Sequence, residues 1–134
     1  MQNSRILVMV SRLLFPFVVM FGLYIIVNGS LSPGGGFQGG AILATAILTT
    51  FFAQPTRTLK IKKIILLEKL LFLLMVVLLL AGYFLGGEFF MNLTRSPWLP
   101  FSLSSYLVFL NLLIGLKVAL GLTAIVYVFY EEVR

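Results

Sequence analysis

Four long apolar runs dominate the chain and limit what it can fold into. They cover residues 6–27, 37–53, 64–85 and 106–130. An α-helix rises about 1.5 Å per residue, so the first run spans about 33 Å and can cross a hydrocarbon core of about 30 Å. Only 10% of the residues are charged and 60% are hydrophobic, whereas soluble domains carry about 25% charged residues. We therefore predict an all-α integral membrane protein, a single membrane domain over residues 1–134 with four transmembrane helices.

The placement of positive charge predicts the orientation of these helices. With four spans, both termini and the connector at residues 54–63 lie on one side of the membrane. Eight cations fall on that side: Arg5, Arg12, Arg57, Lys60, Lys62, Lys63, Lys69 and Arg134. The opposite side has only Arg95, so the positive-inside rule predicts cytoplasmic termini in a multi-pass protein of the cell membrane. The net charge of +6 then reflects membrane orientation, and no nucleic-acid partner is expected.

The first run also bears on processing of the N-terminus. It is longer than the apolar region of a signal peptide and lacks a small-residue cleavage site, so we expect no cleavable signal peptide.

A glycine-rich segment, NGSLSPGGGFQGG at residues 28–40, separates the first two runs and holds six of the twelve glycines. Pro33 disfavours helix at the residue before it, and the three glycines after it can adopt positive φ. Gly36, Gly40 and Ala44 then share one helix face, where small residues let another helix approach closely in a bilayer. We predict that this segment, called here the glycine corner, docks a neighbouring subunit. Its residues are Pro33, Gly34, Gly35, Gly36, Phe37, Gln38, Gly39 and Gly40.

The composition argues against nucleotide, metal and cofactor sites. Gly34, Gly36 and Gly39 match G-x-G-x-x-G, but a dinucleotide site requires a preceding strand and an acidic residue about 20 positions later, and neither is present. The chain has no cysteine and no histidine, which excludes disulfides, thiol chemistry and the usual zinc, haem or iron–sulfur ligation by this chain alone. We expect no catalytic residue, no metal and no cofactor.

Lys117 is the only ionisable residue near the centre of a run. It lies about twelve residues from either end, further than a lysine comfortably reaches toward the interface. Gly121 and Ala124 share its helix face, which leaves room for a partner helix. We expect Lys117 to be paired or hydrated at a subunit interface and, with Asn111, to border a hydrated ion path. The alternative is a structural lysine that binds carbonyl groups or reaches the headgroups.

The carboxylates lie closer to the ends of the runs. Glu68 follows the start of the third run, and we expect it to pair with Lys69 or with the basic connector. Glu88 is expected to be a loop carboxylate, the alternative being a position at an ion entrance. Without an acid at the depth of Lys117, the chain offers no cation ligand or proton-exchanging acid of its own.

The run GSLSPGGGFQGG at residues 29–40 resembles the signature of the MrpB (MnhB) component of the Mrp (Mnh) multi-subunit Na⁺/H⁺ antiporters. Four spans, the chain length and the position of the corner also fit, so the resemblance covers nearly the whole chain. Its distinctive part is the proline, triple-glycine and phenylalanine sequence. The resemblance implies a small non-enzymatic membrane subunit beside large proton-translocating subunits, in a hetero-oligomer that handles Na⁺ and H⁺.

The same module is also built into archaeal membrane-bound hydrogenases and related sulfur-reducing complexes. The MrpB component of stand-alone antiporters commonly carries an acidic residue in the last span, where this chain has Asn111. The run NLLIGLKVALG at residues 111–121 is more similar to the version in the respiratory complexes. Two alternatives stay open: a self-contained small cation or multidrug exchanger, which requires a membrane-centred carboxylate, and a membrane assembly protein without a transport role.

Overall fold

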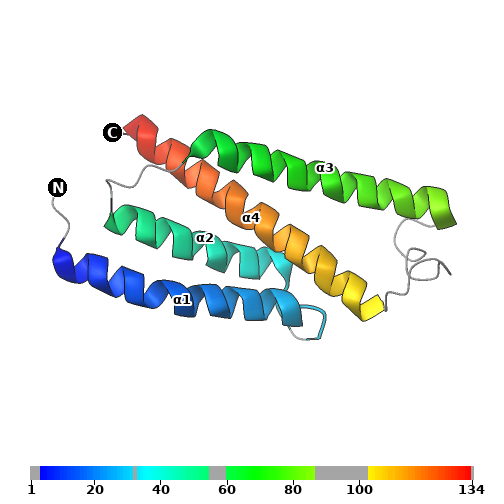
Figure 1. Cartoon of the computed structure of the whole chain (residues 1–134), viewed down its shortest axis with the longest axis horizontal. Helices are drawn as coiled ribbons and strands as arrows, with labels where there is room; N and C mark the ends of the chain where they lie inside the picture. Colours follow the sequence, from blue (N-terminus) through cyan, green and yellow to red (C-terminus); the bar gives the residue numbers. More distant parts are fainter. Residues whose placement is uncertain (1–3, 32, 55–59, 87–102, 134) are drawn as a thin grey trace.

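The computed structural model describes residues 4–31, 33–54, 60–86 and 103–133. This part of the chain contains four α-helices and no strand: α1 (Arg5–Asn28), α2 (Gly36–Ala53), α3 (Ile61–Gly86) and α4 (Leu103–Val133) (Figure 1). Each helix contains one predicted apolar run, and each is long and apolar enough to cross a membrane. The all-α, multi-pass membrane fold is therefore confirmed.

Two predictions about the connections are not tested. The cytoplasmic placement of the termini stays a prediction. The expected loop residue Glu88, together with Arg95 and Arg57, lies outside the described residues.

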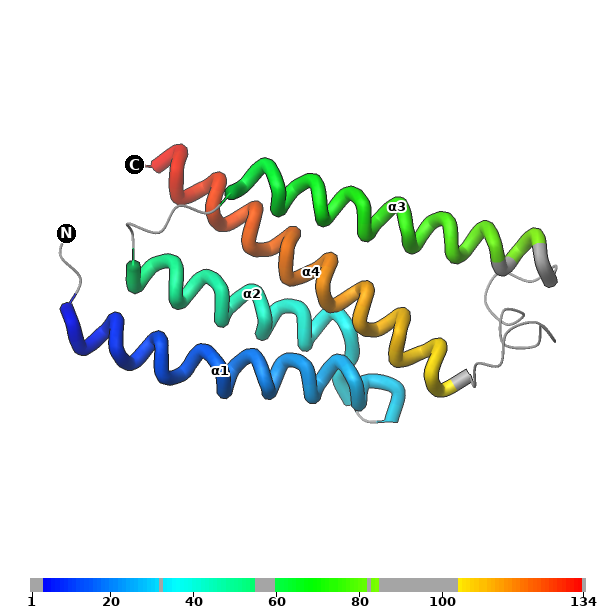
Figure 2. The backbone as a smooth tube through the Cα atoms, viewed as in Figure 1, coloured from blue at the N-terminus to red at the C-terminus, as the bar shows by residue number. Residues whose placement is uncertain are grey.

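The four helices lie side by side in the order α1, α2, α4, α3, which differs from their order in the sequence (Figures 1 and 2). α2 packs between α1 and α4, and α1 makes a smaller contact with α4. α4 is also the only helix of the described part against which α3 packs. α1 and α3 therefore form the two outer edges of the row.

Burial follows this order. Half of the α2 span, 50%, is buried within the chain, whereas the α3 span is 0% buried. The core consists of Ile26, Leu43 and Ala119, with Val19 and Leu112 packed against them. These residues belong to α1, α2 and α4, so α3 makes no contribution to the buried core.

Most polar side chains within the spans bond to the backbone of their own helix. Thr123 is 0% exposed and its hydroxyl donates a hydrogen bond of 2.7 Å to the carbonyl oxygen of Ala119. Thr45, Thr49 and Thr50 bond in the same way to the carbonyl four residues earlier. Within the described residues, no buried side-chain nitrogen or oxygen lacks a partner. These groups thus avoid the cost of an unsatisfied polar atom in hydrocarbon.

Candidate functional site

The glycine corner reverses the chain between α1 and α2. After α1, the N–H of Leu31 donates to the carbonyl oxygen of Asn28 at 2.9 Å. Gly34 and Gly35 then adopt φ values of +146° and +140°, which L-residues with a side chain rarely adopt. Gly36 is already helical, because α2 begins there. The predicted positive φ is therefore found at two of the three glycines.

The small-residue face of α2 packs against α4 of the same chain. A β-carbon added at Gly36 would lie 2.5 Å from the carbonyl oxygen of Asn111, and one at Gly40 would lie 2.5 Å from that of Gly115. Gly115 in turn lies against Ile26 of α1, whose Cδ1 would be 2.5 Å from an added β-carbon. The backbones are thus in direct contact, as the small residues predicted.

The helix that packs on this face of α2 is not the one that we expected from the sequence. We expected the smooth face of α2 to hold a neighbouring subunit, but Gly36, Gly40 and Ala44 are buried inside the chain. The reason is that α4 carries its own small residue, Gly115, opposite this face. Phe37 remains 65% exposed, and Gln38 is also exposed. Pro33 is exposed as well, so docking of the corner to another subunit stays a prediction that now depends on these three residues.

Lys117 is paired with an acid from α3. Its Nζ lies 3.0 Å from Oε1 of Glu68 and 5.2 Å from the centroid of the Phe72 ring, one turn further along α3. Gly121 provides room for this contact, since a β-carbon there would lie 3.9 Å from Cγ of Glu68. The side chains of Lys117 and Glu68 are 31% and 26% exposed. We call these two residues the α3–α4 ion pair.

This pair overturns two expectations from the sequence. Glu68 pairs with Lys117 and, among the residues that the structure describes, not with Lys69 or the lysines of the connector. Lys117 does have a facing acid. α3 begins at Ile61, earlier than the apolar run, so Glu68 lies about 10 Å along the helix. Lys69 is the next residue and points about 100° away around the helix.

Gly121 and Ala124 predicted room for a partner helix on the face of Lys117, which was expected at a subunit interface. The helix found there is α3 of the same chain.

Asn111 does not join Lys117. Its side-chain amide lies beside the glycine corner, where β-carbons added at Gly29 and Gly35 would lie 3.2 Å from Nδ2 and 3.7 Å from Oδ1. Asn111 and Lys117 are six residues apart, which places them about 120° apart around α4. The structure therefore assigns the two predicted residues of the ion path to different faces of the helix.

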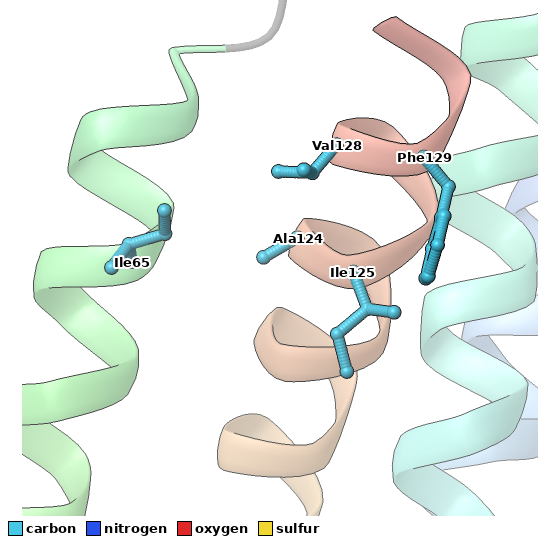
Figure 3. A pocket seen from close by; sticks show the side chains of 5 residues that line it. All are labelled: Ile65, Ala124, Ile125, Val128 and Phe129. Atoms are coloured by element: carbon cyan, nitrogen blue, oxygen red, sulfur yellow. The ribbon is translucent and has the colours of Figure 1, made fainter. Parts of the chain in front are cut away.

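Next to the ion pair, the contact between α3 and α4 is loose. An open apolar groove of about 300 Å³ is lined by Ile65, Ala124, Ile125, Val128 and Phe129. Ile65 of α3 faces Ala124 and Val128 of α4 across the groove (Figure 3). The described residues contain no cluster of three or more His, Cys, Asp or Glu side chains that could hold a metal ion. The ion pair is the charged interaction that joins these two helices.

Comparison with known proteins places these features in a family. Residues 6–124 match a domain related to the MnhB subunit of Na⁺/H⁺ antiporter. An uncharacterized protein of Methanocaldococcus jannaschii is 30% identical over 127 residues, covering 85% of this chain and 48% of that protein. The mnhB2 antiporter subunit of Staphylococcus saprophyticus is 35% identical over 52 residues, covering 39% of this chain and 37% of that subunit.

A solved structure extends the similarity to the fold. A chain of the membrane-bound sulfane sulfur reductase, an archaeal respiratory membrane complex, superposes with a TM-score of 0.80 at 35% sequence identity. The match covers 93% of this chain and 57% of that chain. The protein thus spans between 37% and 57% of the length of these relatives. Because the family match covers nearly all of α1 to α4, the chain belongs to the MnhB family of domains related to the Na⁺/H⁺ antiporter subunit.

Proposed function

We propose that this chain is a non-catalytic subunit of an ion-translocating membrane complex of the Na⁺/H⁺ antiporter type. Its role is to connect neighbouring membrane subunits. It contributes one charged pair to the ion-translocating complex and does not form a complete ion pathway by itself. The observation that carries this proposal is the row of four helices, in which the buried core of the described residues is apolar and the ion pair lies at one edge.

A self-contained exchanger requires ionisable groups surrounded by its own helices. The core of this chain is instead filled by Ile26, Leu43 and Ala119 and by the backbone contacts of the glycine corner. The ion pair lies at the edge of the row, where both of its side chains are partly exposed. This arrangement supports an accessory role and argues against a stand-alone small exchanger.

The surface of the row supports contact with other membrane subunits. Both outer helices, α1 and α3, expose large apolar and aromatic side chains, including Phe17 at 59%, Phe72 at 55% and Phe84 at 80%. Lipid tails are as apolar as these side chains, so the hydrophobic effect does not drive helices together in a membrane. Helices there associate through van der Waals packing of their surfaces. Phe37 extends this surface beside the glycine corner.

The respiratory setting is a finer part of the proposal. The solved relative belongs to a sulfane sulfur reductase complex and matches 93% of this chain, whereas the match to mnhB2 covers 39%. These coverages favour a complex in which a redox reaction drives ion transport, with the redox cofactors held by other subunits.

Purification of the tagged chain from native membranes in mild detergent tests the proposal. We expect large antiporter-like subunits to co-purify in fixed ratio, and the isolated chain in vesicles to show no exchange of Na⁺ for H⁺. Exchange by the isolated chain would establish the stand-alone alternative. Association only with incomplete complexes would identify an assembly protein without a transport role.

A further inference from the structure

Both residues of the α3–α4 ion pair lie more than one helical turn from the ends of their helices. Glu68 is seven residues from the start of α3, or about 10 Å along its axis. Lys117 is fourteen residues from the start of α4 and sixteen from its end, or about 21 and 24 Å. Glu68 lies between Leu67 and Lys69 on α3, and Lys117 lies between Leu116 and Val118 on α4. Ionised groups at such a depth are costly and usually functional.

The chain itself does not cover this pair. α4 is the only helix of the described part that packs against α3, so α1 and α2 provide no cover. The two side chains remain 31% and 26% exposed, and the adjoining groove is apolar. Hydrocarbon against these charges would be unfavourable. A hydrated or polar surface from outside the chain is therefore required.

The α3–α4 ion pair also has hydrogen-bonding positions that are not used within the described residues. The threonine hydroxyls in the spans, in contrast, bond to the backbone of their own helix. Oε1 of Glu68 accepts from Lys117, but within the described residues no other hydrogen bond to this carboxylate is found. A carboxylate has four lone-pair positions and an ammonium has three donors. One face of the ammonium lies over Phe72, which is exposed to the outside of the chain. Carboxylate oxygen thus remains open to a further cation or to water.

We propose that Glu68 is a binding site for a monovalent cation, H⁺ or Na⁺, at a hydrated space between the α3–α4 edge and a neighbouring subunit. Lys117 is the internal cation that neutralises Glu68 when the site is otherwise empty. This inference rests on the proposed function, because the neighbouring subunit supplies the other wall of the space.

Binding exchanges one cation for another at the carboxylate. When H⁺ arrives from water, an O–H bond forms on Glu68 and the ammonium of Lys117 keeps its three protons. When Na⁺ arrives, it coordinates a carboxylate oxygen and displaces the ammonium. In both cases the charge of the site changes from zero to +1. Release reverses the step, and competition from the tethered ammonium keeps the binding reversible.

Modification with dicyclohexylcarbodiimide, an apolar reagent for protonated carboxyl groups, tests the site in the intact complex in lipid vesicles. Peptide mass spectrometry would compare Glu68 with the exposed carboxylates Glu131 and Glu132 of the same chain. We expect modification of Glu68 to exceed that of the other two at least fivefold. Suppression by Na⁺, but not by choline at equal ionic strength, would assign Na⁺. Modification unaffected by Na⁺ would assign H⁺ alone, and absence of modification at Glu68 would overturn the proposal.

Two variants separate ion binding from a purely mechanical link between α3 and α4. Glu68→Gln retains the shape of the side chain, and the exchanged pair Glu68→Lys with Lys117→Glu restores an ion pair with its charges in reversed positions. We expect both complexes to assemble, with Na⁺-dependent proton transport reduced about tenfold or more. Glu132→Gln, in the exposed end of α4, is the matched control and should transport normally. Wild-type transport by Glu68→Gln or by the exchanged pair would show that the pair is only a link.

A third variant tests the competition by Lys117. Lys117→Met removes the ammonium and keeps most of the apolar stem, so modification of Glu68 should increase severalfold. Unchanged modification would contradict the role given to Lys117. If no other subunit co-purifies with the chain, the proposed function itself fails. If the complex assembles but Glu68 is not modified, only the present inference fails.

Discussion

The two sides of α4 make contacts of opposite kinds. Toward α2, the backbone of α4 lies directly against Gly36 and Gly40, where an added β-carbon would be 2.5 Å from a carbonyl oxygen of α4. Toward α3, a lysine reaches across to an acid beside an open groove. The first contact is dry, tight and satisfied within the chain, and the second is charged, loose and partly exposed.

The two contacts meet different requirements of a membrane subunit, a stable fold and a surface that can interact with other molecules. Close packing of α1, α2 and α4 fixes the fold, because van der Waals contact is the main source of helix association in a bilayer. The α3–α4 contact contributes less packing, which leaves its side chains free to interact with something outside the chain. Four substitutions test whether the two contacts differ as described.

The largest effect is expected from Gly40→Leu in the tight contact. Its β-carbon would lie 2.5 Å from the backbone oxygen of Gly115, which no side-chain rotation relieves. We expect the free energy of unfolding to fall by at least about 3 kcal/mol, measured by circular dichroism during denaturation in mixed micelles. Gly121→Ala, where the nearest side-chain atom is 3.9 Å away, should change it by less than about 0.5 kcal/mol. Equal losses would contradict the comparison.

Phe51→Ala removes an anchor at the other end of the α2–α4 contact. Phe51 is 6% exposed, and its ring centroid lies 5.2 Å from that of Tyr127 and 5.7 Å from that of Tyr130. We expect a loss of about 2 kcal/mol in the same measurement, since the lost contacts leave a cavity. Phe84→Ala on α3, at an 80% exposed position, is the control and should be nearly neutral. A comparable loss there would show that α3 is packed more firmly than described.

Phe72→Leu should have a smaller effect in the loose contact. The substitution removes the ring that lies 5.2 Å from the ammonium of Lys117 and retains apolar bulk. We expect a loss of about 0.5 kcal/mol, the size of an exposed cation–π interaction. The loss should disappear when Phe72→Leu is introduced beside Lys117→Met, as a double-mutant cycle requires. Persistence of the loss in that background would assign it to packing.

The smallest effect is expected from Ala124→Leu, which adds atoms to the open groove. The groove of about 300 Å³ accommodates the larger side chain, so stability should change by less than about 0.5 kcal/mol. The same substitution at Ala44, which is 2% exposed in the tight contact, should cost about 2 kcal/mol. Similar outcomes at the two alanines would remove the distinction between the contacts.

The sequence predicted the parts of the structure that depend on local properties. Run length and hydrophobicity predicted the four helices, and Pro33 with the glycines after it predicted where the chain reverses. Positive φ at Gly34 and Gly35 follows from the absence of a β-carbon, which a sequence shows directly.

The contacts between helices depend on register and neighbour order, which the sequence does not show. Gly36 and Gly40 predicted close packing but not that Gly115 would be the partner. Glu68 was assigned to Lys69 or the basic connector because its depth was measured from the start of the apolar run and not from the start of the helix. The separation of Asn111 from Lys117 around α4 could have been predicted from helix geometry alone.

The order of the helices in the row has a consequence for synthesis and membrane insertion. α1 and α2 contact each other directly, so this pair can pack as soon as both helices have left the translocation machinery. α3 is inserted third, but its only neighbour in the described part of the chain is α4, which is synthesised last. Until then the described part of the chain offers α3 no packing partner, and α4 must enter between α2 and α3. Arrival of the last helix completes the tight contact and the charged contact in a single step.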